Sequence, residues 1–184
     1  MTVSATWPAA VRRLAAKFQQ LPVRVTVGSD DLTANSRIEQ RIDVFDDVRS
    51  KEWVSEFNQN FQFLKTYHDY SQRLLELLRS LFHKKKSVSA DESRILVFAL
   101  YKKETARVEQ MLRRQGYLVG ALHGDMSQTA RLEALENFKN GKTGLMVATD
   151  VAARGLDIPN VRAVINYTFP LTIEDYIHRI GRTG

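Results

Sequence analysis

Two pairs of polar residues in the second half of the sequence have the types and spacing to bind a phosphate. Arg179 and Arg182 stand three residues apart beside His178, in "HRIGRTG", and the glycines around them leave room for an anion. Gln128 and Arg131 fall in the first turn of an expected helix, on the same side. A helix N-terminus with a planar amide and a guanidinium suits a phosphate backbone, although such a pair is more often a solvated face.

A third group lies in "TDVAARGLD", residues 149–157. Thr149 ends an expected strand, and Gly155 frees the backbone for a close approach. Arg154 and Asp157 place opposite charges three residues apart. A carboxylate here could accept from sugar hydroxyls, and a hydroxyl with backbone N–H groups could hold a phosphate. The alternative is a surface turn closed by a salt bridge between Arg154 and Asp157.

The elements around these groups alternate between strand and helix. Ser127 can cap one helix, with Leu132, Leu135 and Phe138 on one face, and Thr172 with Asp175 has capping-box spacing. Continuous apolar runs separated by helices predict a parallel sheet covered on both faces. The expected strands are residues 94–98, 118–122, 144–149 and 162–167, and the expected helices are 102–115, a segment after Ser127 that ends before Gly141, and 172–180.

Ligands of such a sheet bind at the carboxyl ends of its strands. Gly124 and Asp125, in "HGD", follow the expected strand at 118–122 and so join the same edge as the other groups. "NGKTG" (140–144) imitates the end of a phosphate loop, but Glu136 stands where that motif needs glycine. The sequence therefore contains no complete nucleotide-binding loop.

The first part of the chain predicts a different organisation. Pro8 suits the first turn of a helix that ends near Gln20, and residues 23–27 predict a strand. A polar linker at 29–37 then leads to alternating residues at 38–45, which predict the strand that opens the main domain. A further helix is expected at 73–82. We therefore interpret residues 1–28 as the end of a preceding domain and residues 38–184 as the main domain.

Composition narrows the class of protein. The formal net charge is +6 in 184 residues, which favours an anionic partner such as nucleic acid. The absence of cysteine excludes disulfides and thiolate zinc sites, and the four histidines lack metal-ligand spacing, so no metal site is expected. No apolar run reaches membrane-span length and no signal peptide is recognisable. We expect a soluble intracellular protein without membrane contact.

Six motifs in one order carry a family resemblance: "SAT" (4–6), "ILVFALYKKE" (95–104), "HGDMSQTAR" (123–131), "ATDVAARGLDIPNV" (148–161), "VINYTFP" (164–170) and "HRIGRTG" (178–184). Together they resemble the second, C-terminal RecA-like domain of a DEAD-box RNA helicase. The resemblance implies a RecA-like parallel sheet with helices on both faces. It covers the chain apart from about residues 46–72, and we expect residues 54–72 to be an insertion.

The resemblance also implies roles for individual residues. Arg182 matches a γ-phosphate contact, and His178 with Arg179 matches residues that brace the catalytic centre. Gly155 and Asp157 match a contact to the ribose of ATP. The positions that match RNA-backbone contacts are Gly124, Asp125, Gln128, Arg131 and Thr149, and those that match interdomain coupling are Ser4, Thr6 and Arg154.

By this resemblance the parent activity is ATP-dependent RNA unwinding or remodelling. ATP would be bound with Mg²⁺ held by a first helicase domain, because the phosphate loop and the acidic motif are not in this sequence. The family heptad continues with one more arginine after the glycine that matches Gly184, so we expect a truncated chain that is inactive alone. RNA is the expected partner, through sequence-independent contacts to sugar and phosphate.

A finer resemblance concerns the pathway. "SATWP", "FALYKKE" and "FPLTIEDYIHRIGRTG" resemble the branch of nucleolar helicases that process ribosomal RNA precursors. This implies ribosome biogenesis, pre-ribosomal particles as partners, and a location in the nucleus and nucleolus. Two alternatives stay open: an RNA-binding module without ATPase chemistry, and a DNA translocase on the same core. Arg182, Asp157 and "SAT" argue against a pure binding module, because those residues serve nucleotide chemistry.

Overall fold

The computed structural model describes residues 9–21, 23, 25, 34–43, 59–82, 94–154, 156, 158 and 160–183, with side chains from residue 70 onward in the long second helix. The chain divides into two compact units, Met1–Ala34 and Asn35–Gly184. The first unit contains α1 (Ala9–Phe18), which matches the helix predicted between Pro8 and Gln20. Only residues 23 and 25 of the predicted strand at 23–27 are described.

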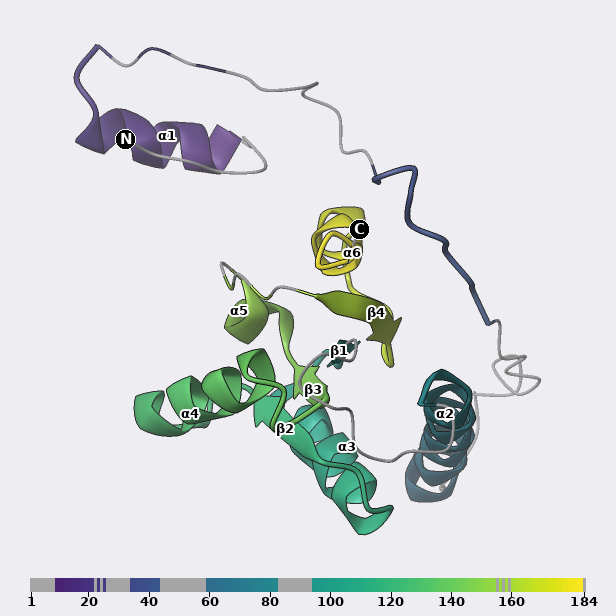
Figure 1. The fold of residues 1–184 in the computed structure, drawn as a ribbon. Coiled ribbons are helices and arrows are strands. Elements are labelled where there is room, and N and C mark those ends of the chain that lie inside the picture. The colour runs from purple at the N-terminus through teal and green to yellow at the C-terminus, as the bar shows by residue number, and fades with distance from the viewer. Residues whose placement is uncertain are drawn as a thin grey trace. The chain divides into compact units, whose positions relative to one another are not determined.

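The second unit is built on a sheet of four parallel strands (Figure 1). In chain order they are β1 (Arg94–Phe98), β2 (Val119–Leu122), β3 (Leu145–Ala148) and β4 (Val161–Asn166), and in space the order is β2-β3-β1-β4. The first three are buried at every position, as their continuous apolar sequence predicts. The predicted parallel α/β architecture is confirmed.

Helices cover both faces of this sheet (Figure 1). They are α2 (Gln59–Leu81), α3 (Lys102–Arg114), α4 (Gln128–Lys139), the short α5 (Asp150–Ala153) and α6 (Ile173–Ile180). Because side chains alternate along a strand, Ile95 and Val97 of β1 pack into the core beneath α2 and α3. Leu96 and Phe98 pack into the opposite core beneath α4 and α5.

The caps that the sequence predicts fix where two helices begin. Ser127 Oγ accepts from the Ala130 N–H at 3.2 Å and opens α4, and Thr172 Oγ1 accepts from the Asp175 N–H at 3.0 Å and opens α6. Gly116 takes a φ of 84° just after α3, a conformation that favours glycine. The two caps therefore place the helix starts that follow β2 and β4 at the carboxyl edge of the sheet, whereas Gly116 ends α3 before β2 begins.

Two expectations are wrong. Residues 38–43, the described part of the strand predicted at 38–45, form no strand, and Ile42 is exposed. A segment with an alternating pattern forms a strand only where it can pair with the edge of a sheet. Here the segment contacts the domain through a side chain instead, since Gln40 Oε1 accepts from the Tyr176 hydroxyl of α6 at 2.6 Å. Leu132 does not join Leu135 and Phe138 in the core and is 57% exposed.

The helix predicted at 73–82 begins much earlier, since α2 runs without a break from Gln59 to Leu81. Two residues of the predicted insertion at 54–72 contact the main core. Tyr70 lies edge-on to Tyr167 with ring centroids 6.1 Å apart, and Ser71 Oγ is 3.0 Å from the Tyr167 hydroxyl. The boundaries of the insertion stay a prediction. Because Tyr70 and Ser71 contact the core, the deletion that tests it should end before residue 70.

Candidate functional site

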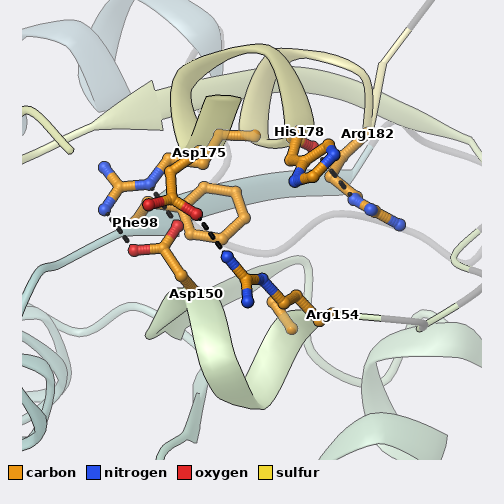
Figure 2. A pocket seen from close by; sticks show the side chains of 8 residues that line it. Phe98, Asp150, Arg154, Asp175, His178 and Arg182 are labelled. Carbon is orange, nitrogen blue, oxygen red and sulfur yellow. Dashed lines mark hydrogen bonds and ion pairs between the residues drawn. The ribbon is translucent and has the colours of Figure 1, made fainter. Parts of the chain in front are cut away.

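A hollow lined by cationic and acidic side chains lies where β1 and β3 end and α5 faces α6 (Figure 2). We call it the cationic hollow. All three residues of the predicted catalytic group line it, and so does Arg154. Its lining residues are Phe98, Asp150, Ala153, Arg154, Asp175, His178, Arg179 and Arg182.

Arg179 is the most constrained side chain in the cationic hollow. It is 1% exposed and binds Asp150 with two parallel bonds, Nε to Oδ1 at 2.6 Å and Nη2 to Oδ2 at 2.7 Å. Its Nη1 donates to the Asn166 side chain and to the Thr168 carbonyl, and its guanidinium lies 5.0 Å from the centre of the Phe98 ring. Four of the five N–H groups of an arginine are thus satisfied inside the domain. The geometry makes Arg179 a brace between α6 and α5.

Asp175 holds the second arginine of the cationic hollow. Arg154 Nη2 donates to Asp175 Oδ1 at 2.6 Å (Figure 2). The Thr172 hydroxyl donates to Asp175 Oδ2 at 2.8 Å. Partial burial alone would raise the pKa of Asp175, but the hydrogen bonds from Thr172 and Arg154 and the charges of Arg154 and His178 outweigh it and leave the pKa below its ordinary value. Arg154 therefore links α5 to the first turn of α6.

His178 and Arg182 lie one helical turn apart at the end of α6. Arg182 Nη1 donates to the Leu156 carbonyl at 3.0 Å and its Nε to the His178 carbonyl at 3.2 Å, with the side chain half-buried. His178 Nε2 is buried without a hydrogen-bond partner among the described residues. Arg182 thus tethers Leu156, the residue between Gly155 and Asp157 in the sequence.

Five other predicted residues lie where β2 and β3 end and α4 begins, and we call them the α4 edge: Gly124, Asp125, Gln128, Arg131 and Thr149. The Thr149 N–H donates to the Leu122 carbonyl at 3.1 Å, so the ends of β2 and β3 are joined directly. Asp125 is half-exposed and accepts from Lys102 Nζ at 2.7 Å. A pair this exposed contributes little stability and can exchange its cation for another ligand.

The remaining members of the α4 edge are open to solvent. Gln128 is exposed and Arg131 is half-exposed, and within the described ranges neither side chain has a hydrogen bond or ion pair. A Cβ added at Gly124 would meet no heavy atom within 4 Å, so packing inside the domain does not require glycine there. These positions therefore have donors and space available to an outside ligand.

Four predicted residues lie outside the described residues: Ser4, Thr6, Gly155 and Asp157. Several residues that structure the site were not predicted as part of it. Asp150 pairs with Arg179, Asp175 pairs with Arg154, and Glu104 binds the connection after β4. Their sequence signals are those of helix starts: Asp150 and Glu104 stand in first turns and Asp175 completes a capping box, so they are easily taken for caps alone.

The donor set suits an anion better than a metal ion. Arg154, His178 and Arg182 line one side of the cationic hollow, and guanidinium groups match phosphate oxygens in geometry. Within the part of the chain that the structure describes, no group of three or more histidine, aspartate or glutamate residues could hold a metal ion. None of the described helices has the length and apolar character needed to cross a membrane.

Comparison with known proteins gives a consistent result. Residues 69–184 match the model of the helicase conserved C-terminal domain. The chain is 54% identical to the ATP-dependent RNA helicase DBP3 of Mycosarcoma maydis and 52% identical to that of Saccharomyces cerevisiae. Both matches cover 98% of this chain. It spans 27% and 30% of those two relatives.

A solved structure of S. cerevisiae Dbp5 bound to RNA and ADP BeF3 is similar to the chain, with a TM-score of 0.69 at 28% sequence identity. The match covers 98% of this chain and 40% of that one. The resemblance that the motifs predict, and the fold that it implies, are therefore confirmed.

Proposed function

Because the chain belongs to the helicase conserved C-terminal domain family and is of the DEAD-box type, we propose that it forms the RNA- and ATP-facing half of an RNA helicase. One observation carries the proposal. At a single edge of the sheet, the α4 edge leaves a guanidinium, an amide and a bare glycine open, and the adjacent cationic hollow gathers six charged or titratable side chains between α5 and α6. A protein that links RNA to ATP needs both kinds of surface side by side.

On the RNA side, Gln128 and Arg131 donate to backbone oxygens, with the N-terminus of α4 adding its partial positive charge. Gly124 lets the sugar–phosphate chain approach the loop, and Thr149 adds a hydroxyl at the end of β3. Asp125 can accept from a 2′-hydroxyl while Lys102 offsets its charge against phosphate. Contacts to phosphate and sugar carry no direct sequence information, so binding is indifferent to base sequence and sensitive to salt.

On the nucleotide side, Arg182 approaches the γ-phosphate and Gly155 with Asp157 holds the ribose. Support comes from the Arg182 bond to the Leu156 carbonyl, because Leu156 stands between Gly155 and Asp157 in the sequence. ATP supplies the phosphoryl group whose transfer such a site promotes, and an arginine at the γ-phosphate can contribute ~10³–10⁵ in rate. His178 and Arg154 complete the polar lining, and Arg179 keeps α5 and α6 at a fixed separation.

A first helicase domain supplies the rest of the ATP site in this proposal. Mg²⁺ is held there, by the acidic motif of that domain. Residues 1–28 belong to the end of that first domain, residues 29–37 form the linker, and Ser4 and Thr6 with Arg154 couple the two domains. The pathway proposal, ribosomal RNA processing on pre-ribosomal particles in the nucleolus, is supported by the motif resemblance alone.

The test joins this chain to a DEAD-box first domain, extends it past Gly184 with the arginine that follows in the family motif, and measures ATP turnover with and without single-stranded RNA. RNA should stimulate turnover, and Arg182→Ala should lower kcat by about 10³-fold while changing RNA affinity in the absence of ATP much less. Lys142→Ala, an exposed cation away from both surfaces, serves as the matched control. RNA binding without any turnover would favour an RNA-binding module, and equal stimulation by DNA would favour a DNA translocase.

A further inference from the structure

Glu104 is a buried carboxylate at the carboxyl edge of the sheet, and the proposed function does not use it. It is 6% exposed, and no cation pairs with it within the described ranges. Its Oε2 accepts from the Leu100 N–H at 2.8 Å, and its Oε1 accepts from the Thr168 hydroxyl at 2.6 Å. Burial of an unpaired carboxylate costs free energy, so its donors must offset that cost.

These bonds join two loops that are far apart in the sequence. Leu100 follows β1, whereas Thr168 follows β4, and both strands end at the same edge of the sheet. Thr168 is held a second time, because its carbonyl accepts from Arg179 Nη1 at 2.7 Å. Glu104 thus fixes the hydroxyl of Thr168, and the carbonyl of the same residue accepts a hydrogen bond from Arg179.

The sequence of bonds continues through Arg179 to Asp150. The four residues Glu104, Thr168, Arg179 and Asp150 form what we call the buried chain, which crosses from α3 to the first residue of α5. Charged groups stand along it at both ends and in the middle, so each bond is charge-assisted or polarised by its neighbour. Asp150 is preceded directly by Thr149 of the α4 edge.

We infer that Glu104 is a positioning residue: through Thr168 it fixes Arg179, and through Arg179 it fixes Asp150 and the start of α5. The buried chain then positions both Thr149, the proposed RNA contact that precedes Asp150, and the wall of the hollow that Arg182 lines. The inference that Glu104 positions Arg179 does not depend on the proposed function. The expected effect on RNA affinity does rest on it.

The first test follows the Arg179 Nε–H group by nuclear magnetic resonance in the 184-residue chain. In the wild type this proton exchanges slowly with water, because it is buried and bonded to Asp150. Thr168→Val removes the hydroxyl at nearly constant volume and should speed exchange at least tenfold, and Glu104→Ala should do the same. Thr168→Ser, which keeps the hydroxyl, should restore slow exchange.

A matched control separates positioning from general destabilisation. Thr105 is buried in the same helical turn as Glu104, and its hydroxyl donates to the Tyr101 carbonyl at 3.1 Å, outside the buried chain. Thr105→Val should leave Arg179 exchange within about twofold of the wild type. The double variant of Glu104→Ala and Thr168→Val should exchange no faster than either single one, since both break the same link.

The inference is overturned if Thr168→Val and Glu104→Ala leave Arg179 exchange unchanged, or if Thr105→Val accelerates it equally. Should Glu104→Ala fail to fold, the contrast between Thr168→Val and Thr168→Ser decides the matter. In parallel, affinity for a single-stranded oligouridine should fall about threefold in Thr168→Val. If no variant, wild type included, binds that RNA, the proposed function fails, whereas the exchange result still decides the role of Glu104.

Discussion

The cationic hollow and the α4 edge lie on one sheet edge, yet they differ in how far their polar groups are already paired. In the hollow, Arg179 and Arg154 each have a carboxylate at 2.6 Å. At the α4 edge, Gln128 and Arg131 have no such partner within the described residues, and Gly124 faces open space. The first region is organised by the chain itself, and the second has donors left over for a ligand. The buried Arg179 of the hollow is therefore expected to govern stability, and the exposed donors of the edge to govern affinity.

The largest expected effect concerns the interior of the hollow. Arg179→Ala should lower the free energy of unfolding by about 3–5 kcal/mol, because it leaves the Asp150 carboxylate half-buried without its cation. Arg131→Ala, at the α4 edge, should change it by no more than about 0.5 kcal/mol. Urea denaturation of both variants measures the contrast. Equal free energies of unfolding for the two variants would contradict the claim that the hollow governs stability and the α4 edge does not.

A smaller effect should appear at acid pH. The pKa of Asp175 in the folded domain lies below its ordinary value of 3.8. A carboxyl with a depressed pKa contributes stability above that ordinary value, and the contribution is lost as the pH falls through the folded pKa. The wild type should therefore lose stability below about pH 4, and Asp175→Asn should lose less over the same interval.

The control for this prediction is Asp43, whose pKa is also lowered, first of all by its hydrogen bond from Arg73. That pair is exposed to solvent and screened, so Asp43→Asn should change the acid slope less than Asp175→Asn. Urea titrations between pH 7 and pH 3 compare the three proteins. Identical acid slopes for the wild type and Asp175→Asn would show that the Arg154 link contributes nothing to the hollow.

The smallest effect is expected from the predicted insertion. Described contacts between α2 and the core begin at Tyr70 and Ser71, and Leu74 and Leu78 are buried beyond them. Deletion of residues 54–69 should therefore leave the midpoint of thermal unfolding unchanged. A loss above about 2 kcal/mol would show that the segment packs against the domain.

The two regions also differ in how many of their site residues could be predicted from the sequence. Continuous apolar runs and caps at Ser127 and Thr172 locate the parallel strands and helix starts, because those signals are local. The residues of the α4 edge were predicted individually, since each follows a strand or opens a helix. The pairing partners in the hollow were not, because Asp150 meets Arg179 across 29 positions and Arg154 meets Asp175 across 21. The described part of the strand predicted at 38–45, residues 38–43, forms no strand for the same reason: a strand requires a neighbour that sequence periodicity does not reveal.

The most direct test of the account is RNA affinity of the 184-residue chain, measured by fluorescence anisotropy with several single-stranded RNAs of unrelated sequence. We predict weak, salt-sensitive binding that Arg131→Ala reduces about tenfold for every RNA alike, at unchanged thermal stability and with a shallower salt dependence. Arg113→Ala, which removes an exposed arginine on α3 away from the α4 edge, should leave affinity within about twofold. Unchanged affinity in Arg131→Ala, or a loss confined to one RNA sequence, would contradict the assignment of the α4 edge to the RNA backbone.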